Sequence, residues 1–175
     1  MSLSKNEKQF EQLSVLIVED NRFFRSLIRS VLREFGVRYI EEAEDGADAL
    51  AHLGSSPPDI ILLDWYMPVF SGADFMRMFN ETKKAGHFSP AVIVVTSNAT
   101  KKNVIEAAKL GVDGILCKPI VPALLYRRIV EVLPKNQAEN IEGSGSVETK
   151  WAASLPAHIF SVKHEELDED LVFLL

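Results

Sequence analysis

The chain has 175 residues, of which 47% are hydrophobic and 25% charged, and this composition predicts one folded domain with an appendage rather than a disordered or fibrous protein. Its 25 acidic and 19 basic residues give a net charge of −6, which disfavours direct binding to nucleic acid or to an anionic membrane. The single cysteine excludes an intramolecular disulfide, and the sequence has neither an apolar signal core in residues 1–13 nor an apolar run of about 20 residues. We therefore expect a cytoplasmic protein.

Short apolar runs predict the strands. In chain order they are residues 15–18, a weaker outer run at 37–43, and then 60–63, 92–95 and 115–117. The runs are too short for helices and are rich in aliphatic and β-branched side chains, which is typical of strands buried on both faces of a parallel sheet.

Helical periodicity fills the intervals between these strands. The first helix is predicted from apolar residues at helical spacing, namely Phe24, Leu27, Ile28, Val31, Leu32 and Phe35. Gly36 follows as a typical helix-ending residue, and the same spacing returns in residues 125–133. Strand and helix thus alternate five times, which predicts a doubly wound α/β domain with a five-stranded parallel sheet and helices on both faces.

Polar side chains follow the predicted central strands where each strand ends. Glu19 and Asp20 follow the first strand, and Asp64 follows the strand at 60–63. Thr96 and Lys118 follow the strands at 92–95 and 115–117. Because parallel strands end at one edge of the sheet, where such folds bind ligands, we expect these five side chains to converge in one crevice.

The chemistry of these five residues predicts a metal-assisted phosphoryl site. Three neighbouring carboxylates repel one another unless a hard cation joins them, so Glu19, Asp20 and Asp64 predict a Mg²⁺ site. Lys118 and Thr96 are suited to binding the oxygens of a transferring phosphoryl group, and Asp64 is the predicted nucleophile. An Asp alone at the end of a strand is more often a helix cap or a turn residue than a nucleophile, and a single Thr or Lys there would indicate little, so the prediction depends on all five residues together.

The segments that carry these residues resemble the receiver domain of two-component response regulators, of the single-domain chemotaxis type. The similarity extends over residues 14–134 and includes VLIVEDN, AEDGADAL, PDIILLDWYMPVFSG, VVTSN and CKP, which begin at residues 15, 43, 58, 94 and 117. We accordingly divide the chain into an N-terminal extension (1–13), a receiver domain (14–134) and a linker with an acidic and apolar tail without a recognisable output domain (135–175).

The resemblance implies a phosphoprotein of a two-component system or phosphorelay. A histidine kinase or phosphotransfer protein would phosphorylate Asp64 with Mg²⁺ present, and the domain would catalyse this transfer and slow autodephosphorylation without being an enzyme in the conventional sense. The resemblance also implies the flavodoxin-like strand order 2-1-3-4-5, a Lys118–Pro119 bond that is often cis, and a backbone carbonyl of Tyr66 among the metal ligands.

Two features depart from the pattern of the family, one at residue 115 and one at the pair Tyr66 and Asn98. Ile115 stands three residues before Lys118, where the family commonly has an aromatic residue that swings inward on activation. Tyr66 and Asn98 lie two residues beyond Asp64 and Thr96, where side chains flank the path of the hydrolytic water. The bulky Tyr66 either slows dephosphorylation by crowding that water or simply lies on the surface.

The output is predicted to be protein–protein interaction. The family's usual output face lies on the helix at 100–110, the strand at 115–117 and the last helix, and it would present Lys101, Lys102, Lys109, Tyr126, Arg127 and Arg128. Residues 135–175 contain three lysines and eight acidic residues, so this tail could cover the basic face of its own or a neighbouring chain, as in a homodimer. It could instead be a loosely ordered tail or a fused partner peptide.

Other functions fit the residues less well. Phosphatases with an aspartyl phosphate intermediate need a second Asp where Tyr66 stands, and the acidic residues after the first strand would repel the phosphate of a flavin. A degenerate receiver that acts as a scaffold or as a tail-regulated interaction module is the remaining alternative.

Overall fold

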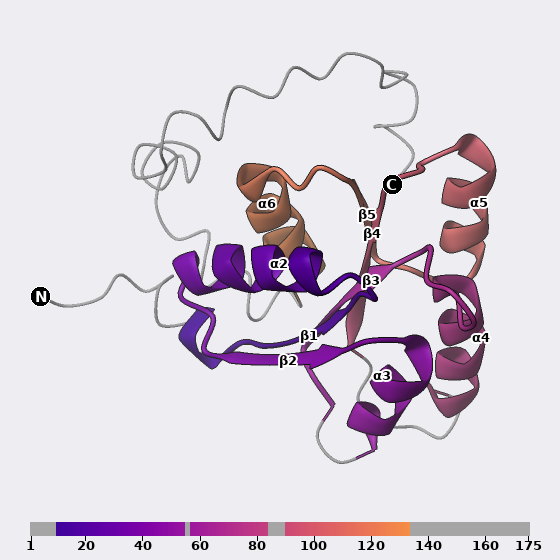
Figure 1. Cartoon of the computed structure of the whole chain (residues 1–175), viewed down its shortest axis with the longest axis horizontal. Helices are drawn as coiled ribbons and strands as arrows, with labels where there is room; N and C mark the ends of the chain where they lie inside the picture. Colours follow the sequence, from indigo (N-terminus) through magenta and orange to yellow (C-terminus); the bar gives the residue numbers. More distant parts are fainter. Residues whose placement is uncertain (1–9, 55–56, 84–89, 134–175) are drawn as a thin grey trace, which may run out of the picture.

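Strands and helices alternate along the chain in the computed structural model, which describes residues 10–54, 57–83 and 90–133 (Figure 1). The strands are β1 (Ser14–Val18), β2 (Tyr39–Ala43), β3 (Ile60–Asp64), β4 (Ala91–Thr96) and β5 (Gly114–Cys117). The helices are α2 (Arg22–Glu34), α3 (Gly46–Leu53), α4 (Gly72–Lys83), α5 (Lys101–Lys109) and α6 (Pro122–Val132). Among the described helices, none has the length and apolar character needed to cross a membrane.

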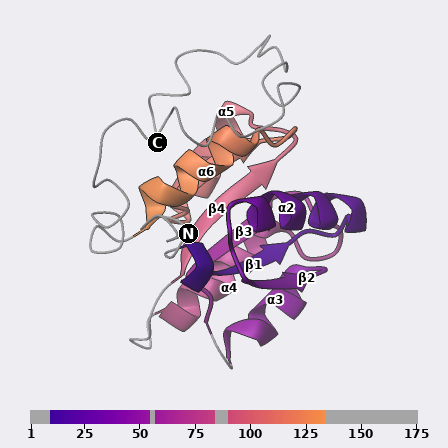
Figure 2. The same ribbon diagram turned by 90° about the vertical axis from the view of Figure 1, so that its left-hand side faces the viewer.

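The strands form one parallel sheet in the order β2-β1-β3-β4-β5, which confirms the predicted fold. Figure 2 shows β2, β1, β3 and β4 following one another in this order. The register places Asp64 beside Val95 and Thr96 beside Cys117. The polar residues that end these strands therefore share one edge of the sheet. The outer strand is shorter than predicted, since β2 begins at Tyr39 and Val37 is buried just before it.

Helices cover both faces of the sheet (Figure 1). Alternate side chains of β1 point to opposite faces: Val15 and Ile17 pack with residues of α2 and α6, while Leu16 and Val18 pack with residues of α3, α4 and α5. The continuous apolar runs in the sequence follow from this burial on both faces.

Helix α2 leads away from the acidic pair at the end of β1. Asn21 caps the helix, because its side chain accepts hydrogen bonds from the backbone N–H groups of Phe23 and Phe24. Gly36 follows the helix with a φ of 93°, a left-handed conformation that favours glycine. The predicted apolar face was wrong at one position, since Leu27 is exposed whereas the charged residue Arg25 is buried.

An aromatic group joins the start of the described chain to α6. Phe10 stacks on Tyr126 with 5.0 Å between ring centroids, and Phe35 meets both rings edge-on. The expectation that Tyr126 is displayed on the output face was therefore wrong, because its ring is buried under Phe10. The interactions predicted for residues 135–175 lie outside the described residues.

Candidate functional site

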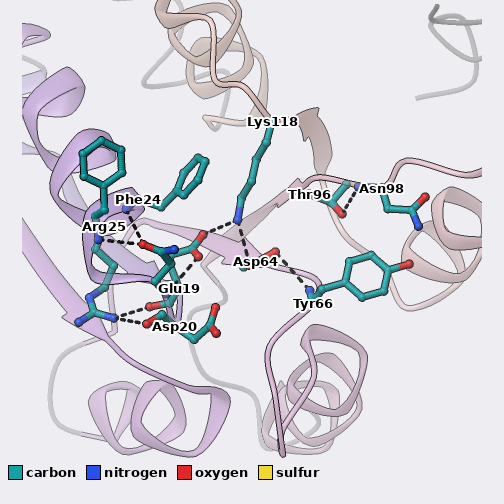
Figure 3. A network of polar contacts seen from close by, with 11 residues as sticks. Glu19, Asp20, Phe24, Arg25, Asp64, Tyr66, Thr96, Asn98 and Lys118 are labelled. Carbon is teal, nitrogen blue, oxygen red and sulfur yellow. Dashed lines mark hydrogen bonds and ion pairs between the residues drawn. The ribbon is translucent and has the colours of Figure 1, made fainter.

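Three carboxylates meet beyond the ends of β1 and β3 (Figure 3). Glu19 and Asp64 are buried, while Asp20 is exposed. One oxygen of each carboxylate lies within 4.8 Å of the others, which is close enough for all three to bind the same metal ion. Oxygen ligands of this kind suit a hard cation such as Mg²⁺.

Lys118 links two of these carboxylates from the end of β5. Its Nζ donates hydrogen bonds to Glu19 Oε2 at 2.7 Å and to Asp64 Oδ2 at 3.0 Å. The ring of Phe24 covers the ammonium group, with its centroid 4.5 Å from Nζ. The backbone N–H of Lys118 also donates to the carbonyl of Thr96 at 2.7 Å, so the ends of β4 and β5 are joined, and the Lys118–Pro119 bond is cis.

Burial and the neighbouring charges shift the pKa values of Glu19 and Lys118. Burial raises the pKa of Glu19, and the nearby Asp64 carboxylate raises it further, although the hydrogen bond from Lys118 opposes the shift. Burial lowers the pKa of Lys118, but its hydrogen bonds to Glu19 and Asp64 more than offset this effect, so that its pKa is raised overall. Lys118 therefore stays charged beside the carboxylates.

Thr96 lies buried at the end of β4 with its hydroxyl oriented by the following loop. Its Oγ1 accepts a hydrogen bond from the backbone N–H of Asn98 at 3.1 Å. Asp64 is oriented in a similar way, because its Oδ1 accepts from the backbone N–H of Tyr66 at 3.2 Å. Both residues face the same edge of the sheet as Lys118 (Figure 3).

Tyr66 connects the loop after β3 to α5. Its hydroxyl is hydrogen-bonded to the side-chain amide of Asn103, and the same amide donates to the carbonyl of Asn98 at 3.0 Å. The ring is partly exposed, but its hydroxyl is held in place. The loops that follow Asp64 and Thr96 are thus tied together through Asn103.

The start of α4 approaches Asp64 very closely. The backbone N–H of Gly72 donates to the carbonyl of Trp65 at 3.2 Å, and a Cβ at Gly72 would lie 2.7 Å from the carbonyl oxygen of Asp64. Only glycine fits this approach, because the obstructing atoms belong to the backbone.

Ile115, at the position where the family commonly has an aromatic residue, is half-buried and packs against the core on the α3, α4 and α5 side of the sheet.

Sequence reasoning missed two residues around the site, Arg25 and Asn103. Arg25 lies three residues before Ile28 and seven before Leu32, so it falls on the buried stripe of α2, and this placement was an available signal. Asn103 gave no signal, because its role depends on the distant Tyr66.

Residues 15–130 match the family described as response regulator receiver domain. The chain belongs to this family. Its receiver domain is 33% identical over 123 residues to the chemotaxis protein CheY of Pseudomonas aeruginosa, covering 70% of this chain and 98% of that protein. It is 30% identical over 125 residues to CheY-3 of Vibrio cholerae, covering 71% of this chain and 95% of that protein.

Solved structures place the receiver domain in the same group. The chemotaxis protein CheY4 of Vibrio cholerae superimposes with a TM-score of 0.63 at 27% sequence identity, covering 69% of this chain and 98% of that chain. The receiver domain is therefore of the CheY type, which is consistent with a phosphoaccepting response regulator.

Proposed function

We propose that this protein is a response regulator that accepts a phosphoryl group on Asp64 from the phosphohistidine of a sensor histidine kinase or a phosphotransfer protein. A carboxylate oxygen of Asp64 forms the new bond to phosphorus while the bond between phosphorus and the histidine nitrogen breaks. The observation that carries this proposal is the position of the Lys118 ammonium group. It donates hydrogen bonds to both Glu19 and Asp64 at the edge of the sheet where the strands end.

The three clustered carboxylates fit a Mg²⁺ ion. Glu19, Asp20 and Asp64 would hold it together with the backbone carbonyl of Tyr66. A bound cation would offset the negative charge of the phosphoryl oxygens.

Lys118 and Thr96 then stabilise the phosphorylated state. The Lys118 ammonium binds a phosphoryl oxygen, and the Thr96 hydroxyl donates a hydrogen bond to another. Since the backbones of these two residues are hydrogen-bonded to each other, they respond to the phosphoryl group together. The same groups support slow autodephosphorylation, so the domain catalyses its own modification without being an enzyme in the conventional sense.

The signal leaves through protein–protein contacts on α5, β5 and α6. Lys101, Lys102 and Lys109 are exposed on α5 and suit an acidic target, an acidic tail or a second copy of the chain. Arg127 and Arg128 of α6 both pair with Glu131, which reduces their contribution to the charge of this surface. We propose no direct contact with nucleic acid, because the net charge of the chain is −6.

Phosphoryl uptake from a small-molecule donor tests the proposed function without knowledge of the kinase. The full chain is incubated with acetyl phosphate and Mg²⁺, and its intact mass is measured over time. We expect the wild type to gain one phosphoryl group and Asp64→Asn to gain none, with uptake abolished by EDTA. A wild type that stays unmodified while its fold is intact would instead indicate a degenerate receiver that acts as a scaffold.

A further inference from the structure

Arg25 is a buried cation behind the acidic pair of the site. The residue is 5% exposed and lies on α2, on the side that packs against the sheet. Its Nη1 donates to the carbonyl oxygens of Glu19 at 2.6 Å and Asp20 at 3.2 Å. In Figure 3 the guanidinium lies on the far side of these two residues from Lys118.

Two carboxylates from the edge of the sheet lie next to the other nitrogens of Arg25, although its buried Nε donates no hydrogen bond to a described residue. Its Nη2 donates to Glu44 at 2.8 Å, and its Nε lies 3.4 Å from Glu42. The two carboxylates balance the buried positive charge, so the guanidinium holds the acidic segment without adding an uncompensated cation next to the three site carboxylates. One planar group thus ties α2, the end of β1 and the end of β2 together.

This arrangement constrains the part of the chain on which the metal site depends. Glu19 and Asp20 are consecutive residues whose carboxylates would move apart through mutual repulsion if their backbone were free. Because Arg25 binds both of their carbonyl oxygens, it fixes the backbone from which both side chains extend toward Asp64. Preorganised ligands bind a cation more tightly than ligands that must first be ordered.

We propose that Arg25 is a positioning residue of the phosphoryl site, which holds Glu19 and Asp20 in the arrangement that binds the divalent cation. The inference rests on the proposed function, since it assumes that these carboxylates bind Mg²⁺. Groups that orient metal ligands without touching the metal typically contribute about 10- to 100-fold to metal affinity. We expect a loss of this size when the guanidinium is removed.

Three variants separate positioning from packing. Arg25→Met keeps an unbranched side chain of similar length but removes every hydrogen bond to the acidic pair. Arg25→Lys keeps the buried charge. Its single nitrogen cannot contact the two backbone carbonyls and the two carboxylates at the same time. Arg29→Met is the matched control, because Arg29 lies one turn further along α2, pairs with Glu42 at 2.6 Å and is 47% exposed in its side chain.

The measurement is the Mg²⁺ dissociation constant of the full-length protein. Quenching of Trp65, the neighbour of Asp64, reports binding in a Trp151→Phe background, and calorimetry provides an independent value. Circular dichroism and thermal unfolding record the stability of each variant. We expect the dissociation constant to rise at least about tenfold in Arg25→Met, by less in Arg25→Lys, and less than about twofold in Arg29→Met.

Affinity and stability together decide the result. The inference is wrong if Arg25→Met binds Mg²⁺ as tightly as the wild type, even if the variant unfolds at a lower temperature. In that case Arg25 contributes to packing alone. If Arg25→Met does not fold, Arg25→Lys decides, and an unchanged dissociation constant in that variant is equally contradictory. A wild type that does not bind Mg²⁺ would overturn the proposed function as well, so the two failures are distinguishable.

Discussion

Lys118 supplies the positive charge that opposes two buried carboxylates, Glu19 and Asp64. Replacing it by methionine leaves both carboxylates without this cation. We expect Lys118→Met to lower the free energy of unfolding by about 3 kcal/mol in EDTA, because a buried charge that loses its partner is strongly destabilising. Denaturant unfolding measures the loss.

Magnesium provides the control for this prediction. The cation would occupy the same carboxylates, so Mg²⁺ should stabilise Lys118→Met more than the wild type and reduce the difference between them. Lys109→Met, on the exposed side of α5, should change stability by less than about 0.5 kcal/mol. An equal loss with and without Mg²⁺ would contradict the metal site.

The residues of the site differ in how far the sequence predicts them. Asp64, Thr96 and Lys118 could be predicted because the carboxyl ends of parallel strands meet at one edge. Arg25 was missed although it falls on the buried stripe of α2, because an arginine in a helix is usually exposed and its burial depends on partners after β1 and at β2 that are distant in the sequence. The burial of Tyr126 was missed for the same reason, because it depends on a distant residue. Phe10 stacks on the Tyr126 ring, and Phe10 lies in the N-terminal segment, far from the helix that contains Tyr126.

Among the elements, α4 begins with a reciprocal cap next to the loop that follows Asp64. The Ser71 hydroxyl accepts from the backbone N–H of Asp74, and the Asp74 carboxylate accepts from the Ser71 hydroxyl at 2.6 Å and from its backbone N–H. These hydrogen bonds from Ser71 lower the pKa of Asp74 below its ordinary value of 3.8. The charged carboxylate is therefore the form that stabilises the helix start.

This pKa shift predicts how stability depends on pH. A carboxyl group whose pKa is lowered by folding contributes stability above its unfolded pKa and loses it as pH falls through the folded value. We expect Asp74→Asn to be less stable than the wild type at neutral pH, and the difference should shrink as the pH falls below the ordinary pKa and disappear once it falls below the lowered pKa of the folded state. Thermal unfolding across this range is the measurement, and a difference that persists in acid would contradict the role of the charge.

Tyr66 and Asn103 form a second element-scale feature, the tie between the loop after β3 and α5. If the held ring crowds the hydrolytic water, Tyr66→Ala should shorten the lifetime of the acyl phosphate several-fold. Asn103→Ala should shorten it in the same direction, because it releases the ring. Loss of phosphoryl label after donor removal measures both lifetimes, and unchanged values would favour a ring that merely lies on the surface.

At the scale of the whole molecule, the core extends beyond the predicted domain start at residue 14. Phe10 is 2% exposed and packs on Tyr126 and Phe35 in the core layer of α2 and α6. We expect Phe10→Ala to lower the free energy of unfolding by about 3 kcal/mol or more. Phe23→Ala is the matched control, because Phe23 is 74% exposed and its loss should cost less than about 0.5 kcal/mol. Equal effects of the two changes, measured by denaturant unfolding, would contradict this placement.

The fold of the domain was easier to predict from the sequence than the residue at which the domain begins. Five alternations of a short apolar run with a helical segment dictate a parallel sheet, and the resemblance to receivers gave the strand order that the structure confirms. The burial of Phe10 could not be predicted, because a single aromatic residue in a polar segment has no period to reveal it.

In the proposed function Asp64, among three neighbouring carboxylates, carries the phosphoryl group. The most direct test is to phosphorylate the full chain with acetyl phosphate and Mg²⁺, reduce the acyl phosphate with borohydride, and locate the reduced residue by peptide mass spectrometry. We predict modification at Asp64 alone and none in Asp64→Asn. Modification at Asp20 or Glu19, or labelling that persists in Asp64→Asn, would contradict phosphorylation at Asp64.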